Sequence, residues 1–208
     1  MTDLNSLVVS GLNGAVLTSA VSINVSGQIV ALACPTTLSC ATFKLDPLTP
    51  GKTRAIEYYH EGFDHYFLTT IPDEITKLDN GTFVGWRRTG ERVDVDGSVV
   101  AGTVSVCRFF SAAFAPKSSH FYTPYAAECD TVKRDPVWTF EGDVFRIALP
   151  DGIGGCPAGR VPLYRVYNNG MGGAPNHRYT TSLGIRQAMV ALGWTAEGFG
   201  PQITFACV

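Results

Sequence analysis

The amino-acid sequence predicts a mainly β protein with short helices, in which a small N-terminal β segment precedes a pseudo-threefold repeat domain. Three observations lead to this prediction. Rare residues recur at nearly equal intervals after residue 53, each recurrence lies in the same succession of strand-like and helix-like patterns, and part of the N-terminal region alternates apolar with polar residues. The chain has 208 residues, 45% of them apolar, which is enough to bury a core.

The repeat rests on the tryptophans and histidines. The chain has only three tryptophans, and each falls at the same place in its copy: Trp86, Trp138 and Trp194. Three of the four histidines follow the same pattern, 55 and then 57 residues apart: His65, His120 and His177. Chance does not distribute rare residues in this way, so we expect three units, at residues 53–102, 103–155 and 161–208.

Each unit is expected to contain two strands, a short helix and a third strand. An aromatic strand leads through a loop to a second strand that ends at a threonine, which is Thr70, Thr123 or Thr181. Residues 126–132 and 183–190 show helical spacing, and the threonine hydroxyl is expected to cap the helix. One unit of about 50 residues cannot bury its own apolar face, so we expect the three to close around a shared core.

Residues 1–47 are predicted to form a separate β segment. Residues 21–25 alternate apolar with polar side chains, and the Ser-Gly-Gln of residues 26–28 is typical of a turn before a second strand. Pro47, Pro50 and Gly51 mark a linker to the repeat domain, which we place at residues 53–208.

The charge balance argues against two classes of partner. Lysine and arginine number 16 against 18 aspartate and glutamate residues, which gives a net charge of −2. Without an excess of positive charge, we expect binding neither to nucleic acid nor to an anionic membrane surface. No uncharged apolar run approaches the roughly 18 residues of a membrane-spanning helix, so no span is expected.

The cysteines indicate an exported protein. Six is an even number in a small, glycine-rich chain, which favours disulfides formed in an oxidising compartment. Pairs that close local units would be Cys34–Cys40, Cys107–Cys129 and Cys156–Cys207; free buried thiols in a cytosolic protein are the alternative. A secretory signal peptide begins with basic residues, but the single charged side chain of residues 1–43 is acidic. We therefore expect a secreted or extracytoplasmic protein without a signal peptide in this chain.

Two resemblances follow from these motifs. The three units, with their His-Phe-Tyr-Thr strand and Trp-x-x-Glu-Gly turn, resemble an extracellular bacterial repeat family of unknown function. That resemblance implies a secreted multidomain protein, often with the repeat appended to hydrolases of cell-wall or polysaccharide material. Residues 22–30 resemble one HAF-type repeat, a short strand–turn–strand unit. The first unit departs most from the family pattern, because Thr89 stands where the others have Glu141 and Glu197.

Three histidines and two glutamates suggest a catalytic site. If the threefold axis brings His65, His120 and His177 together, their imidazoles would hold a divalent metal, zinc or calcium, with an open position for water. Glu141 or Glu197 would then act as the general base in the hydrolysis of an ester or lactone. The alternative is that each histidine anchors its own unit through a hydrogen bond to a backbone carbonyl or to its neighbouring tryptophan.

Aromatic and amide side chains suggest carbohydrate binding instead. Sugar rings stack on aromatic faces, while amides and carboxylates bind the hydroxyl groups. The candidate ligand-binding residues are Trp86, Trp138, Trp194, Tyr122, Tyr179, Asn169 and Asn176, and the candidate binding loops are residues 112–119 and 168–176. Aromatic residues on strands are commonly core residues, so burial is the alternative.

Other motifs favour structure over chemistry. Asp94 and Asp96 precede Gly97 as in calcium loops, but no bidentate glutamate follows. We therefore expect a hairpin across Asp96-Gly97, with residues 92–95 paired with residues 98–101. The sequence has no Gly-x-Ser-x-Gly nucleophile elbow and no glycine loop that leads into a helix.

Three functions stay open on these grounds. We expect an exported module that binds carbohydrate or another small-molecule ligand. A small metal-dependent hydrolase of an ester or lactone is the main alternative, and a purely structural or protein-interaction repeat is the third.

Overall fold

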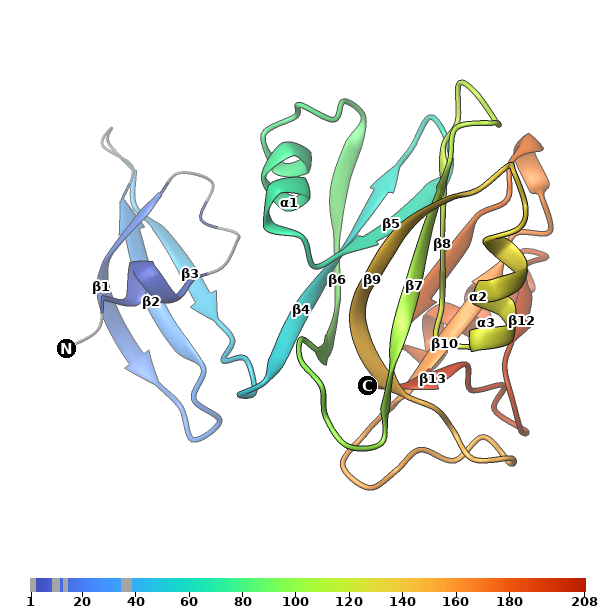
Figure 1. The fold of residues 1–208 in the computed structure, drawn as a ribbon. Helices are drawn as coiled ribbons and strands as arrows, with labels where there is room; N and C mark the ends of the chain where they lie inside the picture. Colours follow the sequence, from blue (N-terminus) through green and yellow to red (C-terminus); the bar gives the residue numbers. More distant parts are fainter. Residues whose placement is uncertain (1–2, 9–11, 13–14, 35–38) are drawn as a thin grey trace.

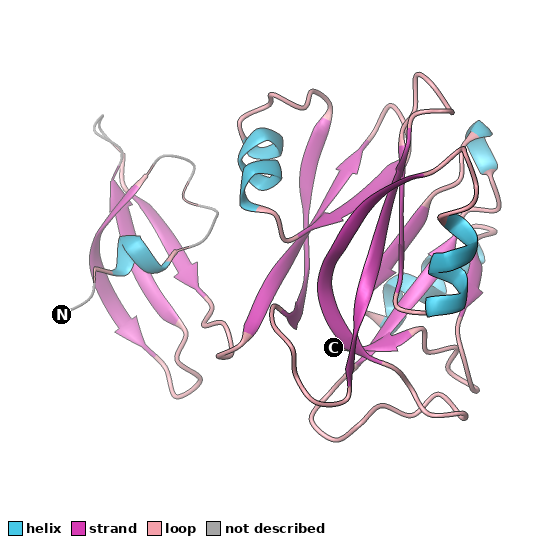
Figure 2. Ribbon diagram, in the orientation of Figure 1, coloured by secondary structure: helices cyan, strands magenta, loops and turns pink. Residues whose placement is uncertain are grey.

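The computed structural model describes all residues except 1–2, 9–11, 13–14 and 35–38, and its strands pair antiparallel throughout (Figure 1). The described residues form an N-terminal sheet of three strands and a larger sheet of ten. Short helices lie at the periphery of the strands (Figure 2). None of the helices in the described part of the chain combines the length and the apolar character needed to cross a bilayer.

The N-terminal sheet has the strand order β1-β2-β3, with β1 at Val16–Ile23, β2 at Ile29–Cys34 and β3 at Ala41–Leu45. The expected turn after β1 is present, since a backbone hydrogen bond joins residues 24 and 28 and Gly27 has a φ of 74°. A short 3₁₀ helix at Leu4–Leu7 precedes the strands. The fully buried residues of this sheet are few and small apart from one leucine, so its core is thin: Leu17, Ala31 and Ala33.

The larger sheet is built from three successive segments of the chain. The first segment contains β4 (Lys52–His60), β5 (His65–Thr69), α1 (Pro72–Asp79) and β6 (Trp86–Asp96). The second contains β7 (Thr103–Ser111), β8 (Ser119–Thr123), α2 (Ala126–Val132) and β9 (Thr139–Ala148). The third contains β10 (Pro162–Tyr167), a 3₁₀ turn (Met171–Gly173), β11 (His177–Thr180), α3 (Leu183–Ala191), β12 (Thr195–Glu197) and β13 (Ala206–Cys207).

The strands of the three segments close almost into a ring around one core. The main path runs β11-β10-β13-β9-β6-β4-β5, and its two end strands, β11 and β5, lie next to each other. The largest buried cluster draws on every segment, with residues such as Tyr58, Ile147 and Phe205. The expected succession of strand, strand, helix and strand is therefore present, and the segments share their apolar interior.

Helices α2 and α3 begin where the sequence predicts them, but the predicted caps Thr70, Thr123 and Thr181 are wrong, because the N-cap residues of the three helices are Ile71, Tyr125 and Ser182. The hydroxyls of Thr69, Thr123 and Thr180 accept a hydrogen bond from the backbone N–H two residues further on. These threonines close the turn between the second strand and the helix. Helices α1 and α2 have no side-chain cap, and Ser182 caps α3.

The predicted hairpin across Asp96-Gly97 is wrong. Strand β6 continues to Asp96 and pairs with β4 over nearly the whole length of that strand. Asp94 forms an ion pair with Arg54, and Asp96 forms ion pairs with Lys52 and Arg160. These contacts hold β6 against β4, so residues 92–95 are not available to residues 98–101.

The three predicted disulfides are present. Cys34–Cys40 links the end of β2 to the residue before β3, Cys107–Cys129 links β7 to α2, and Cys156–Cys207 links the loop after β9 to β13. No free cysteine occurs among the residues that the structure describes.

Candidate functional site

The three loops that join the first two strands of each segment meet at one end of the larger sheet, at the top of Figure 1. They comprise residues 61–64, 112–118 and 168–176. Three buried side chains connect them. His65 Nδ1 donates to the carbonyl of Ser118 at 2.6 Å, because a carbonyl can only accept. The hydroxyl of Ser119 donates to Pro175 at 2.5 Å, and the amide of Asn176 donates to Asp64 at 2.8 Å.

These three hydrogen bonds form a closed ring, in which each segment binds the backbone of the next. His65 thus occupies the place of Ser119 and Asn176, and each of them stands four residues before the threonine that closes the turn to the helix. His120 and His177 correspond to Tyr66 instead. The sequence pattern aligned His65 with His120 and His177, but this alignment is shifted by one residue in the first segment. Equivalent positions are defined by the hydrogen bond to the neighbouring loop, and a histidine makes this bond only in the first segment.

His120 and His177 pack among aromatic rings. The His120 ring lies 4.2 Å from that of Phe67, and the His177 ring lies 4.7 Å from that of Tyr167. Burial, together with a nearby arginine, lowers the pKa of both histidines to about 3, so both are neutral at pH 7. No group of three or more His, Cys, Asp or Glu within the described residues could hold a metal ion. Zinc or calcium binding by His65, His120 and His177 therefore stays a prediction, and the described residues provide no cluster of ligands for it.

Glu141 and Glu197, the predicted general bases, lie in ion pairs with buried arginines. Arg108 Nε is 2.8 Å from the Glu141 carboxylate, and the same guanidinium binds both oxygens of Glu74 on α1. Burial raises the pKa of Glu141, and the positive charge of Arg108 opposes that shift.

The third segment repeats this arrangement on the helix of the second. Arg165 Nε is 2.7 Å from Glu197, and its other nitrogens bind both oxygens of Glu128 on α2. Burial also raises the pKa of Glu197, against the charge of Arg165. Each arginine therefore ties a strand of one segment to the helix of the preceding segment, and the two glutamates complete these ties.

The first segment has a glutamate, Glu57, at the strand position where the other two segments have Arg108 and Arg165. Glu57 lies opposite Leu68 on the neighbouring strand, as Arg108 lies opposite Tyr122 and Arg165 opposite Tyr179. Glu57 is only 2% exposed.

Arg178 of the third segment donates to both oxygens of Glu57, at 2.9 and 2.8 Å, and Thr89 donates its hydroxyl at 2.7 Å. A glutamate at position 89 would repel this buried carboxylate, which explains the departure of Thr89 from the repeat pattern. Glu57 was not among the predicted site residues, although the sequence carries a signal for it, a lone acid among the otherwise apolar and aromatic residues 55–59.

Four of the seven predicted ligand-binding residues belong to the packed interior. At most 8% of each is exposed: Tyr122, Tyr179, Trp194 and Asn176. The Tyr122 hydroxyl donates to Leu68 and the Tyr179 hydroxyl to the Tyr122 carbonyl. Trp86 and Trp138 are half-buried, and Asn169 is exposed. The solvent-facing candidates are therefore these last three.

The hairpin loops themselves form the first candidate surface. We call it the hairpin-loop surface, and its charged, amide and aromatic side chains that reach solvent at least in part are Glu61, Phe63, Asp64, Phe114, Lys117 and Asn169. The Asn169 amide donates to the Gly193 carbonyl and accepts from the Thr195 hydroxyl, which fixes its orientation. The loops predicted at residues 112–119 and 168–176 thus lie together, with residues 61–64 beside them.

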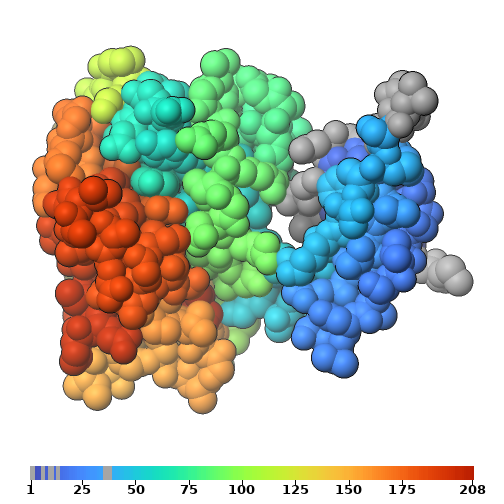
Figure 3. All heavy atoms as spheres, turned by 180° about the vertical axis from the view of Figure 1, so that it is seen from behind, coloured from blue at the N-terminus to red at the C-terminus, as the bar shows by residue number. Residues whose placement is uncertain are grey.

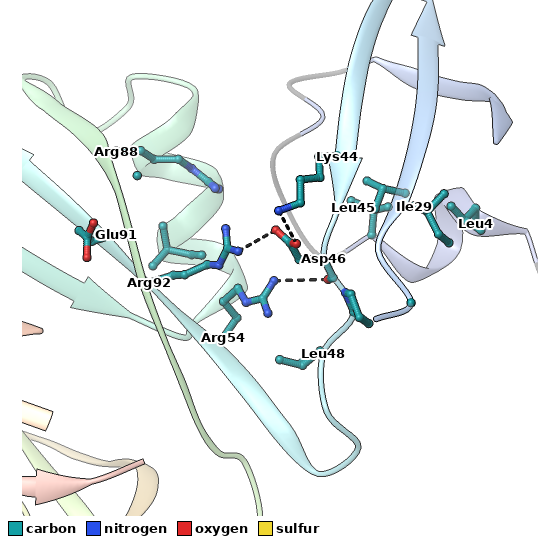
Figure 4. Close-up of a pocket in the computed structure, with 15 residues that line it drawn as sticks. Leu4, Ile29, Lys44, Leu45, Asp46, Leu48, Arg54, Arg88, Glu91 and Arg92 are labelled. Atoms are coloured by element: carbon teal, nitrogen blue, oxygen red, sulfur yellow. Dashed lines mark hydrogen bonds and ion pairs between the residues drawn. The ribbon is translucent and has the colours of Figure 1, made fainter. Parts of the chain in front are cut away.

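A groove of about 610 Å³ between the N-terminal sheet and strands β4 and β6 is the second candidate surface (Figure 4). Viewed from behind, the N-terminal sheet forms a separate lobe beside the larger body (Figure 3). Lys44 and Asp46 line the groove from one side, and Arg54, Arg88 and Arg92 from the other. This groove was not predicted from the sequence, because its lining comes from separate stretches of the chain, at residues 4–8, 27–29, 44–56 and 88–92.

Comparison with known proteins gives one match. A family model described as a domain of unknown function (DUF5648) matches residues 41–148, from β3 to the end of β9. The match covers more than half of the chain and ends before the third segment. No curated protein and no solved structure matches the chain.

Proposed function

This chain belongs to the DUF5648 family, and we propose that it is an exported module that binds carbohydrate through the hairpin-loop surface. The observation that carries the proposal is the closed ring of hydrogen bonds from His65, Ser119 and Asn176, which fixes three loops from distant parts of the chain beside one another. Loops held on a rigid scaffold are the usual place of recognition. The three disulfides support an oxidising, extracytoplasmic location.

We also propose that residues 53–208 are three copies of one unit related by a pseudo-threefold axis. Two further sets of contacts pass from segment to segment in the same cyclic order as the ring. One is the set of buried ion pairs described above. The other consists of ring contacts, Phe67 with His120, Phe121 with His177, and Arg178 with Tyr66. A repeat of this kind would present its three loops at one end of the axis.

The placement of the repeated polar residues favours binding over catalysis. One oxygen of Glu141 lies 2.8 Å from Arg108 Nε and one oxygen of Glu197 lies 2.7 Å from Arg165 Nε, so both carboxylates are held in ion pairs. His120 and His177 are neutral and packed against aromatic rings, and their Nε2 atoms lie 3.6 and 3.5 Å from Glu141 and Glu197, the carboxylates that the arginines hold. Polar groups of the hairpin loops are open to solvent, among them the oriented amide of Asn169.

A glycan array followed by calorimetric titration tests the function. Asn169→Ala should weaken the binding of a captured oligosaccharide about tenfold, because it removes an oriented donor and acceptor. Asn80→Ala is the matched control, since Asn80 is an exposed asparagine in the loop after α1. It should leave the affinity within about twofold of the parent value.

Two outcomes would overturn the proposal. The first is the absence of any glycan ligand, or equal loss of affinity in both variants. The second is turnover of a p-nitrophenyl ester or an acyl-lactone that disappears with EDTA and in His120→Ala. That result would establish the metal-dependent hydrolase instead.

A further inference from the structure

The groove between the N-terminal sheet and the larger sheet is organised around one carboxylate. Asp46 accepts from Arg92 at 2.7 Å, from Gln28 at 2.7 Å and from Lys44 at 3.1 Å. Its backbone carbonyl accepts from Arg54 at 3.5 Å. Figure 4 shows Lys44, Arg54 and Arg92 directed toward Asp46 from both walls of the groove. Two cations therefore share a single carboxylate.

The other two guanidinium groups of the groove have carboxylates of their own. Arg54 binds both oxygens of Asp94, and Arg88 binds both oxygens of Asp79. Glu91 also lines the groove, but it lies on the other side of β6 from Arg92 (Figure 4). The four cations of the groove are therefore paired with three carboxylates, Asp46, Asp79 and Asp94, and no ion pair of Glu91 with these cations is found among the described residues.

The two cations that share Asp46 are presented to solvent. The side chains of Lys44 and Arg92 are 59% and 47% exposed, whereas that of Asp46 is 14% exposed. Arg92 donates to Asp46 through one nitrogen, Nη2, so its other N–H groups are available to a ligand. A ligand that enters this groove meets cationic donors first and finds the neutralising carboxylate beneath them.

The remaining wall of the groove is aliphatic. Ile29 and Leu45 come from the N-terminal sheet, Leu48 from the linker and Ile56 from β4. A free phosphate or sulfate would use the cations and leave this wall in contact with water. A ligand that combines one negative charge with an apolar ring face uses both features.

We propose that this groove is a second binding site and that it takes an acidic sugar unit of the uronic acid class. The carboxylate of the sugar pairs with Arg92 and Lys44, and the C–H face of its ring lies on the aliphatic wall. The choice of a sugar rests on the proposed function. The site itself shares no residue with the hairpin-loop surface, so the two can be tested separately.

Calorimetric titration of the full chain with trigalacturonate, and with its methyl ester, tests the proposal. The two ligands share one sugar skeleton and differ in negative charge. The acid should bind, its affinity should fall between about 20 and 300 mM NaCl because exposed ion pairs are screened, and the ester should show no detectable binding. Arg92→Gln should weaken the acid about tenfold, Lys44→Gln should weaken it less, and Arg92→Lys should retain part of the affinity.

Arg87→Gln is the matched control, because Arg87 lies on the same strand as Arg92 but outside the groove, where it contacts Glu61 at 3.9 Å and the Tyr59 ring at 5.5 Å. It should stay within about twofold of the parent. The proposal is overturned if the parent chain does not bind the acid, if the ester binds equally well, if Arg87→Gln loses as much affinity as Arg92→Gln, or if inorganic phosphate alone binds more tightly than the acid. Asn169→Ala should not change binding of the acid, and an effect there would assign that binding to the hairpin-loop surface.

Discussion

His120 and His177 give the clearest example of how the fold alters a single side chain. Each ring is enclosed by aromatic neighbours and lies near a buried guanidinium, so the protonated form is disfavoured both by desolvation and by charge. In the unfolded chain the same histidines take up a proton near pH 6.5. The unfolded state therefore binds more protons than the folded state between about pH 3 and pH 6.5, and stability must fall as the pH falls through this window.

We predict that urea unfolding at pH 7, 6 and 5 will show a decreasing free energy of unfolding, with each histidine contributing up to about 1.4 kcal/mol per pH unit below 6.5. The raised pKa values of Glu141 and Glu197 act in the opposite direction, since they favour the folded state as the pH falls toward 4.5. His120→Phe keeps a ring between Phe67 and Phe110 and should reduce the acid-side slope. An unchanged slope in this variant would show that His120 is not the group that titrates.

At the scale of helices and strands, the sequence predicts what depends on local pattern. The positions of α2 and α3 follow from apolar spacing, and the three disulfides follow from pairing cysteines that are consecutive along the chain, so that each pair closes a local stretch. The hairpin at residues 92–101 fails because Asp94 and Asp96 find cations on β4 and beyond β9, which no local rule contains.

The site residues follow the same rule. The exposed loops at residues 112–119 and 168–176 could be predicted from composition. The buried Glu57, the threonine at position 89 beside it and the groove around Asp46 could not be predicted in this way, because they depend on contacts between residues far apart in the sequence.

The disulfides allow a prediction about single elements. Cys156–Cys207 closes 51 residues of the larger sheet, and in the chain-entropy model its removal costs about 4 kcal/mol, whereas Cys34–Cys40 closes 6 residues and contributes about 2 kcal/mol. All three tryptophans lie in the part of the chain that forms the larger sheet, at the start of β6 or directly before β9 and β12, so tryptophan fluorescence reports on that part alone. Cys156→Ser/Cys207→Ser should shift the fluorescence transition in urea strongly, and Cys34→Ser/Cys40→Ser should leave it in place. A shift in the second variant would mean that both sheets unfold as one unit.

At the scale of the whole molecule, the three segments meet at three junctions, and each junction contains a buried ion pair. Two junctions share one arrangement of charges and the third has the opposite arrangement. Arg108 with Glu74 joins the second segment to the first, and Arg165 with Glu128 joins the third to the second. The last junction, between the third segment and the first, reverses the charges with Glu57 and Arg178. Ile185 on α3 stands where the other two helices carry their glutamate, five residues after the turn threonine. The reversal keeps the buried Glu57 carboxylate paired with a guanidinium, although this junction departs from the pattern of the other two.

If the three junctions are equivalent, the junction between the third and the first segment should tolerate an arginine at position 57, provided that the partners found around Arg108 and Arg165 are introduced with it. Glu57→Arg alone would place a second guanidinium beside Arg178 without a carboxylate, and should lower the free energy of unfolding by at least about 3 kcal/mol. The combined variant Glu57→Arg, Thr89→Glu, Arg178→Phe and Ile185→Glu supplies the two carboxylates and the aromatic ring that surround Arg108. It should recover most of that loss in urea unfolding, because neighbouring substitutions that rebuild one network are strongly coupled. If the combined variant is no more stable than Glu57→Arg, the junctions are not equivalent, and the pseudo-threefold relation between the segments fails.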